Sequence, residues 1–477
     1  MGRSIEPFTE LPRLPSGTVL DKHAGAVMTA AREHGRMVHT LSHDGLSESY
    51  AVSWAVGADV IGYTFLVQDR SWIFQSPVSW YRQKRAWDVT PTYELDASID
   101  LDRPAVSGCL FCHAGSARAI PDRTDQFEPG SLTAISCERC HGPSEKHLSS
   151  PVPGSIVNPA KLNGPERDSI CEQCHLEGEV RILNPGHGWW DFRAGQKQED
   201  VFVTFVRSRS ERGTKAVSQA EQLADSRCAR ESGGRLWCVS CHDPHGERTT
   251  AASVRKVCMS CHADLFAENR HQPAGDCLPC HMAKLRADNV AHAAVTDHTI
   301  PRLPGNALEP RYGLRAWREP DASLRDRDMG LAMINAGSER RDGALMKDGY
   351  NLLAGWYRAY GTQDPDVMSA LGSVLLDMNE ADPAASLFRA ASSLQPSRAE
   401  DLYGLALALN KQGHADDAIA ELRRAIAVDP SYRNAYLMLA QIYADRQQPG
   451  MRTGVIEDYL RFMPESILFR EMLGQPH

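Results

Sequence analysis

Two features are missing from this sequence. No apolar run reaches the roughly 20 residues that a membrane-spanning helix needs, and the mean hydropathy is -0.40. An excess of basic residues is also missing, because 52 Lys and Arg stand against 61 Asp and Glu, giving a formal net charge of -9. Nucleic-acid binding depends on clustered positive charge. The sequence therefore predicts no transmembrane segment and no nucleic-acid partner.

Cysteine is nearly absent outside one repeated motif. Twelve of the 13 cysteines lie in six copies of Cys-x-x-Cys-His, and Cys228 is the exception. In this motif the two thiols bond to the vinyl groups of haem, and the adjacent imidazole binds the iron. The pattern predicts six covalently attached haem c groups rather than a disulfide framework. The predicted haem-bonding thiols are Cys109, Cys112, Cys137, Cys140, Cys171, Cys174, Cys238, Cys241, Cys258, Cys261, Cys277 and Cys280, and the predicted proximal iron ligands are His113, His141, His175, His242, His262 and His281.

Zinc is the alternative, because Cys-x-x-Cys pairs can combine into four-thiolate structural sites. Histidine makes up 18 of 477 residues, so a histidine directly after all six pairs would arise by chance about once in several hundred million sequences. Haem is therefore favoured over zinc. Cys228 is predicted to be a buried, inert thiol, with iron ligation or redox chemistry as its alternative.

Three segments follow from the composition. Residues 1–104 are predicted to be a β-rich part of the haem domain, since runs of β-formers at 50–56, 60–67 and 71–74, with a turn at Asp69-Arg70, indicate a small antiparallel sheet. Residues 105–305 are rich in Gly and Pro and are predicted to form the multihaem cytochrome c domain, with short helices and sparse regular structure.

Residues 320–477 are rich in Ala and Leu and are predicted to form a helical repeat domain. Pro396, Pro430 and Pro464 recur every 34 residues, which is the tetratricopeptide period. The last repeat has Arg452 and Tyr459 where small residues are expected, which indicates a degenerate or capping unit. One more helical pair is predicted at 322–337 and 343–360. The predicted fold class is α+β with much irregular structure, ending in an α-helical tetratricopeptide solenoid that binds a partner or acts as a scaffold.

The sixth ligand of each iron decides whether its haem only passes electrons or also binds a substrate. Residues 1–300 hold ten histidines outside the motifs, enough for six distal ligands. His147, six residues after the second motif, and His245, in Cys-His-Asp-Pro-His, are the strongest candidates. Three haem motifs lie within residues 238–281 and must pack closely, so imidazoles near them are predicted to serve neighbouring irons. These are His271, His292 and His298.

The N-terminal histidines are harder to assign. One of His34, His39 and His43 is predicted to be a distal ligand, and His43 is preferred. His23 and His187 are predicted to be solvated or to support a haem without binding iron, although His187, beside Trp189-Trp190, could instead line an open haem face. A methionine ligand stays open, since the chain has 14.

At this point the chain resembles bacterial multihaem cytochromes with a C-terminal tetratricopeptide region, and its haem part is similar to tetrahaem and doubled Cys-x-x-Cys-His cytochromes. The segments that carry the resemblance are Cys-Leu-Phe-Cys-His (109–113), Cys-Glu-Arg-Cys-His-Gly-Pro (137–143), Cys-Val-Ser-Cys-His-Asp-Pro-His (238–245) and Thr-Asp-His-Thr-Ile (296–300). The resemblance implies distal roles for His43, His147, His245, His271 and His298, and for His292 as well.

The resemblance also implies a location and a function. Haem c is attached outside the cytoplasm, so the protein is expected to be periplasmic or extracellular. The first 20 residues show no export signal. Since relatives carry a further haem motif upstream, Met1 is expected to be internal to a longer precursor with a signal and a seventh haem.

The leading hypothesis is electron transfer to or from a redox protein. The alternatives are an oxidoreductase in which one open haem acts on a small nitrogen or sulfur compound, and a redox-sensing or assembly scaffold. A homo-oligomer also stays open.

Overall fold

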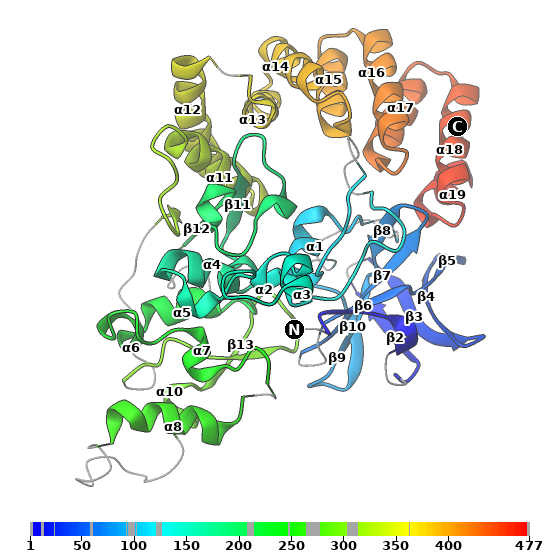
Figure 1. Ribbon diagram of the computed structural model, residues 1–477. Coiled ribbons are helices and arrows are strands. Elements are labelled where there is room, and N and C mark those ends of the chain that lie inside the picture. Colours follow the sequence, from blue (N-terminus) through cyan, green and yellow to red (C-terminus); the bar gives the residue numbers. More distant parts are fainter. Residues whose placement is uncertain are drawn as a thin grey trace. The chain divides into compact units, whose positions relative to one another are not determined.

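The computed structural model describes residues 3–10, 14–22, 24–57, 61–91, 93, 101, 103–120, 126–207, 214–246, 249–263, 277–302, 313–361 and 363–474. The chain divides into two compact units, whose elements are labelled in Figure 1. The five-motif unit falls within residues 135–183 and 187–318. The sheet–solenoid unit falls within residues 3–134, 184–186 and 319–477.

The N-terminal part of the sheet–solenoid unit consists of two antiparallel sheets. Strand β3 shows why they form: Ala26, Met28 and Ala30 are buried while the residues between them are not, the alternation of a strand with one face on a core. Buried side chains of both sheets share one apolar cluster that includes Met37, Phe65 and Trp87. The first sheet has the order β2 (Gly17–Asp21), β3 (Ala26–Glu33), β4 (Arg36–His43), β5 (Leu46–Ala51). The second has the order β1 (Ile5–Pro7), β6 (Trp54–Val56), β7 (Gly62–Asp69), β9 (Val78–Tyr81), β10 (Ala86–Val89), with β8 (Trp72–Gln75) paired to β7.

The predicted antiparallel sheet is confirmed, but it is only part of the β structure. Strands β7 and β8 are antiparallel partners joined at Asp69 and Trp72, close to the predicted turn. The sheet formed by β2 to β5 lies almost entirely before residue 50, where the first predicted run of β-formers begins. Its strands carry many Ser, Thr and charged residues, so they are less apolar than the predicted runs.

The C-terminal part is a stack of helices with the predicted 34-residue period. The helices are α11 (Arg325–Arg340), α12 (Gly343–Tyr360), α13 (Pro365–Asp377), α14 (Ala381–Leu394), α15 (Ala399–Lys411), α16 (Ala415–Val428), α17 (Arg433–Asp445), α18 (Pro449–Phe462) and α19 (Ile467–Gly474). The Phe388 ring fills the space between α13 and α15, because a Cβ on Gly372 or Gly404 would lie 2.9 or 2.5 Å from it. Small residues therefore permit the close helix crossings that the repeat pattern predicted.

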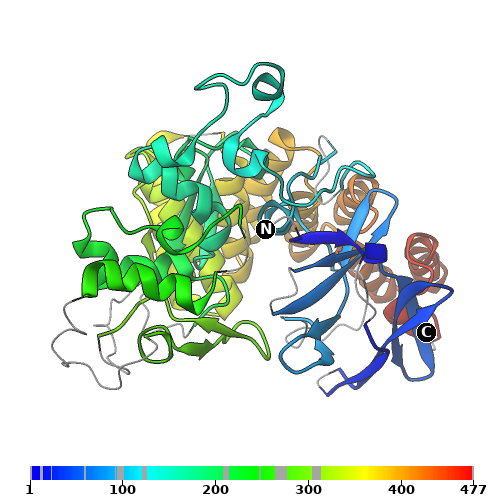
Figure 2. The same cartoon turned by 60° about the horizontal axis from the view of Figure 1, so that its bottom comes forward.

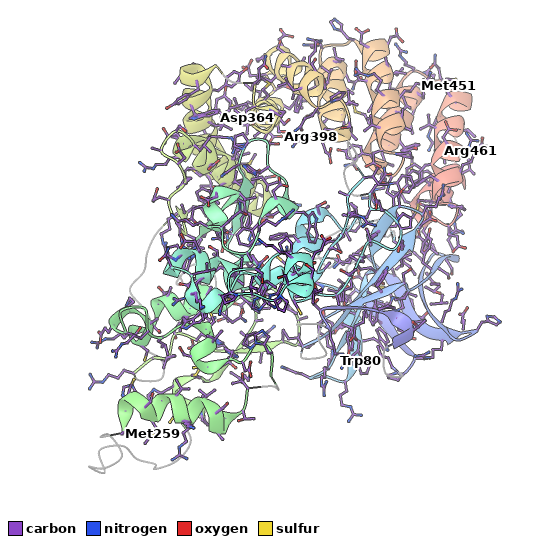
Figure 3. All side chains as sticks on the ribbon, viewed as in Figure 1. Trp80, Met259, Asp364, Arg398, Met451 and Arg461 are labelled. Carbon is purple, nitrogen blue, oxygen red and sulfur yellow. The ribbon has the colours of Figure 1, made fainter. Side chains whose placement is uncertain are left out.

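A charged network links the first repeats. Arg327 is fully buried and donates to the carboxylates of Asp364 and Asp328, each at 2.6 Å. Arg398 continues the network by donating to Asp366 at 2.7 Å. Asp364 and Arg398 precede α13 and α15, at corresponding places in successive repeats, and are labelled in Figure 3.

The last repeat is closed by α19, which explains its departures from the repeat pattern. Tyr459 is fully buried and stacks on Phe469 of α19 with ring centres 3.9 Å apart. Arg452 donates to the backbone oxygen of Met472 at 3.2 Å. The bulky residues at these positions therefore pack against α19, which favours the capping unit over the degenerate one among the two predicted alternatives.

The N-terminal sheets and the last helices also contact each other, and Figure 2 shows α18 and α19 (red) beside the blue strands. Trp72 packs on Phe462 with ring centres 5.0 Å apart. The Ser49 amide donates to Glu465 at 2.6 Å, and Arg470 donates to the backbone oxygen of Ser47 at 2.5 Å. One end of the solenoid is therefore covered by the chain's own sheet.

The five-motif unit contains short helices and two small sheets. Strand β12 is buried along its whole length and pairs with β11 and β15. The helices are α2 (Glu138–His141), α3 (Glu145–Ser149), α4 (Gly164–His175), α5 (Gln219–Asp225), α6 (Arg227–Glu231), α7 (Cys238–Cys241), α8 (Ala251–His262) and α10 (Leu278–His281). The strands are β11 (Val180–Leu183), β12 (Phe202–Val206), β13 (Lys284–Arg286), β14 (Ala294–Thr296) and β15 (Arg315–Ala316). Single 3-10 turns lie at Pro159–Lys161, Trp189–Asp191 and Gln198–Asp200, and another precedes β2 in the sheet–solenoid unit at Phe8–Glu10.

The division into two units differs from the three predicted segments, because the first and last segments share one unit and the first motif lies with them. Helix α1 (Ser107–His113), which holds the first motif, lies in the sheet–solenoid unit, and isolated bridges from Pro104 to Phe74 and from Gln126 to Trp72 tie its flanking residues to β8. The three segments themselves stay a prediction. None of the helices in the described part of the chain is long and apolar enough to cross a membrane.

Candidate haem-binding site

Each Cys-x-x-Cys-His motif lies on a turn of helix. Helices α1, α2, α4, α8 and α10 end at the motif histidine, and α7 spans the two cysteines of the fourth motif. Residues three and four positions apart lie on the same face of a helix, so both thiols and the imidazole of one motif face the same side. All 13 cysteines are free thiols. This local geometry suits attachment of one planar group per motif.

The structure brings His245 to the proximal histidine of the second motif. Nε2 of His141 lies 3.4 Å from Nε2 of His245, although the two residues are 104 positions apart. The ring centres are 5.7 Å apart and the planes differ by 21°. Because the nitrogens are much closer than the ring centres, the imidazoles point at each other instead of stacking face to face.

The proximal histidine of the fourth motif has a similar partner. The rings of His242 and His298 have centres 6.1 Å apart and planes that differ by 26°. Burial, together with the nearby imidazole of His242, lowers the pKa of His298, while a hydrogen bond to the Thr296 backbone oxygen opposes this shift. A lowered pKa favours the neutral imidazole, which is the form that binds metal.

Hydrogen bonds at Nδ1 fix the orientation of these rings. His141 donates to the backbone oxygen of Val157 at 2.8 Å, and His298 donates to that of Thr296 at 2.8 Å. His242 Nδ1 lies 3.0 Å from the Thr249 hydroxyl, and His281 of the sixth motif donates to the Pro301 oxygen at 2.8 Å. A donor bond at Nδ1 selects the tautomer in which Nε2 is the metal-binding nitrogen.

These observations test whether the residues fit haem iron. Metal–imidazole bonds of about 2.0–2.1 Å would put two opposing Nε2 atoms about 4 Å apart and their ring centres roughly 6 Å apart. The pairs His141–His245 and His242–His298 both approach this spacing. The side chains therefore fit an iron held between two imidazoles, with the motif thiols beside it.

The other predicted distal ligands lie in different surroundings. His147, on α3, has Nδ1 2.8 Å from the Ser155 hydroxyl. His292 is exposed in the connection between β13 and β14, with a left-handed backbone (φ 53°). His271, like His23, lies outside the described residues. For these three candidates the ligand role stays a prediction.

The N-terminal histidines belong to the β-sheet part of the chain. His39 is 2% exposed, its Nδ1 lies 2.7 Å from the Ser76 hydroxyl, and burial lowers its pKa to about 3. It packs edge-on against Phe65 and Trp87, so it is a neutral core residue. His34 is exposed in the turn between β3 and β4.

His43, the preferred N-terminal ligand, contacts a carboxylate of the last helix. Its Nδ1 lies 3.0 Å from the Glu471 carboxylate of α19. With Asp44 it forms a group whose potential ligand atoms lie within 4.8 Å of one another. A haem role for His43 stays a prediction.

Cys228, on α6, is half-buried, and its burial raises the pKa of the thiol. A raised pKa keeps the thiol protonated and unreactive, which favours the inert role over redox chemistry. His187 is exposed and lies 3.8 Å from the Asp191 carboxylate.

Sequence reasoning missed the groups that support the third motif. Glu172 and Gln173, the two residues between its cysteines, are both buried. The Arg318 guanidinium forms an ion pair with the Glu172 carboxylate at 2.6 Å, and Trp317 donates to that carboxylate at 3.1 Å. Burial raises the pKa of Glu172 to about 7, although Arg318 opposes this shift. Nothing in the sequence distinguishes this motif, because the partners lie about 145 positions away.

Comparisons with known families identify two segments of the chain. The family model described as Doubled CXXCH motif matches residues 231–267, which hold the fourth and fifth motifs. The family model described as Tetratricopeptide repeat matches residues 399–442, which hold α15, α16 and most of α17. The predicted resemblance is confirmed by these two matches. A comparison with curated proteins finds no match.

Solved structures similar to the chain are tetratricopeptide proteins. A structure of MamA is 19% identical over 31% of this chain and 79% of its own, with a TM-score of 0.27. YrrB, described as a TPR protein with an unusual peptide-binding site, is 18% identical over 32% of this chain and 74% of its own, with a TM-score of 0.27. An O-GlcNAc transferase from Thermobaculum terrenum is 19% identical over 29% of this chain, with a TM-score of 0.27. The matched part is only 26% of the transferase's own length. These likenesses carry no argument about function.

Proposed function

We propose that this chain, with its doubled CXXCH motif and tetratricopeptide repeat, is a multihaem c-type cytochrome that transfers electrons through six covalently bound haems. When bound, haem c supplies reversible one-electron exchange between ferrous and ferric iron. The observation that carries the proposal is the head-on pair His141–His245, with Nε2 atoms 3.4 Å apart and the His141 ring oriented through Nδ1.

The chain's own residues have distinct tasks in this function. The motif thiols anchor each group, and the proximal imidazole of the same helical turn binds on one side. His245 and His298 provide the second imidazole at the second and fourth motifs. Two imidazole ligands leave no position for a substrate, which favours electron transfer over catalysis at these two sites. His43, His147, His271 and His292 stay predicted ligands for the other four.

The solenoid supports a proposal of protein interaction. Tetratricopeptide repeats present extended surfaces to partners. Because α18 and α19 contact the N-terminal sheets, the repeats from α11 to α16 are the better candidates for docking a redox donor or acceptor. The proposal includes a periplasmic or extracellular location, which follows from the chemistry of haem c attachment rather than from a leader segment.

Spectroscopy of the oxidised holoprotein tests the proposal. In His245→Ala, one of the six haems should change from low spin to high spin in electron paramagnetic resonance, since one imidazole ligand is removed. His414→Ala, which removes an exposed histidine of the solenoid, is the matched control and should leave the spectrum unchanged. An unaltered spectrum in His245→Ala would contradict the ligand role. A stoichiometric high-spin haem in the unsubstituted protein that binds nitrite would favour the oxidoreductase.

A further inference from the structure

The fourth motif lies where several motifs meet, which suggests a particular haem order. His242 is the proximal histidine of the fourth motif, and His245 faces the second motif, yet only Asp243 and Pro244 separate them. Three residue steps span at most about 11 Å. Two proposed iron ligands of different haems are therefore carried by one short piece of backbone.

This piece of backbone is also stiff. Pro244 has a fixed φ, and the Asp243 carboxylate accepts a hydrogen bond from the backbone N–H of His245 at 2.9 Å. The bond closes a local turn that points the second imidazole away from the first. Any movement of the fourth motif is thereby passed to the distal ligand of the second.

The third motif touches the fourth directly. The side chains of Cys171 and Cys238 are close enough to interact with each other. These are the first cysteines of the third and fourth motifs. The haems proposed at these two motifs would therefore be attached at neighbouring sulfur atoms.

The fifth motif approaches from another side. Helix α8, which carries it, packs on α7 of the fourth motif, and a cavity of about 320 Å³ lies beside the fourth motif between Cys241 and the α8 residues Ser253 and Val257. Cys258 of the fifth motif is close enough to Cys241 to interact electrostatically. Met259, labelled in Figure 3, lies on α8 next to Cys258.

We infer that the fourth haem is the junction of the array, next to the second, third and fifth, so that an electron that reaches the fourth position can pass directly to the second. The inference rests on the proposed function. At each step one electron leaves one iron and reduces the next, and no bond forms or breaks. A one-electron redox protein supplies the first electron and another accepts the last.

A double variant tests the contact between the second and fourth positions. His245→Ala and His298→Ala should each produce one high-spin haem. In the double variant the two high-spin irons should lie side by side and interact magnetically, so the isolated high-spin signal should be clearly smaller than the sum of the two single variants. Intact mass and circular dichroism verify that all six haems and the fold are retained.

The outcomes separate the inference from the proposed function. If neither single variant becomes high spin, the axial-ligand proposal fails. If both become high spin and the double variant gives the full sum, the junction is overturned while the proposed function stands. If the double variant does not retain haem, His298→Met provides the second measurement in redox titration: it should shift the potentials of both the fourth and second positions, with His414→Ala unchanged. A shift confined to one position would also overturn the junction.

Discussion

The two units are stabilised in different ways. The two large clusters of buried apolar side chains among the described residues both lie in the sheet–solenoid unit, one in the repeats and one between the sheets. In the five-motif unit many buried groups are polar, among them Glu172, Gln198 and Glu221. The first unit can fold around its own side chains. We expect the second to depend on haem attached to its cysteines for much of its apolar interior.

Preventing haem attachment should have the largest effect on stability, and this effect should be confined to the five-motif unit. In Cys171→Ala/Cys174→Ala the third haem cannot attach, so residues 135–318 should open locally and be cleaved by protease faster by about an order of magnitude. Limited proteolysis with mass analysis measures this, and Cys228→Ala is the control with the same type of substitution outside the motifs. Equal protection of both variants would show that the five-motif unit does not need its haem.

Removing the Phe388 ring from the repeats should destabilise the sheet–solenoid unit and leave the five-motif unit unchanged. Phe388→Ala leaves a cavity where Gly372 and Gly404 approach the ring, and should lower the free energy of unfolding of the sheet–solenoid unit by about 3–5 kcal/mol. Urea unfolding followed by circular dichroism measures the loss, while haem absorption should stay constant at low urea. Leu394→Ala, at an exposed position on the same helix, should change stability little. A similar loss in both variants would contradict this packing.

The buried charges of the solenoid should make its stability depend on pH. Burial raises the pKa of Asp401 to about 6, although Arg398 and Ser369 oppose this shift. Since the folded protein then holds the proton more tightly than the unfolded chain, the contribution of this group is present below its unfolded pKa and is lost as pH rises from about 4 to 6. The loss is roughly 1.4 kcal/mol for each unit of pKa shift.

Asp401→Asn, which stays neutral, should flatten this part of the stability curve. Thermal unfolding between pH 4 and 6, followed by circular dichroism, measures the slope. Asp328, whose pKa burial also raises to about 6, should retain part of the pH dependence. If the stability of the variant depended on pH as strongly as that of the original chain, Asp401 would be ruled out as a source of the pH dependence.

The contact between the sheet and the last helix should have the smallest effect. Arg470→Ala removes the bond to the backbone oxygen of Ser47, an exposed contact, and should reduce stability by about 1 kcal/mol or less. Arg389→Ala, within the solenoid, is the control. A loss of several kcal/mol would mean that the sheet supports the solenoid far more than its hydrogen bonds suggest.

The sequence predicted what depends on local spacing. Attachment residues could be identified because thiols and imidazole lie within five positions, and the repeats because prolines recur every 34 residues. The partner of His141 could not be predicted, since it lies 104 positions away and depends on how several loops fold. His39 was a candidate ligand because composition does not distinguish a core histidine from an iron ligand. Its neighbours Phe65 and Trp87 make that distinction only in three dimensions.

The placement of α19 against β5 has a consequence for biosynthesis. The N-terminal strands find this partner only after α19 has been made, and all six attachment motifs lie between β5 and α19 along the chain. Enzymes that attach haem therefore meet the cysteines of the first motif, which lies in the sheet–solenoid unit, before that unit can close. A chain that lost its last ten residues would leave β5 without that cover, and we expect such truncated protein to aggregate through its strands even when every haem is attached.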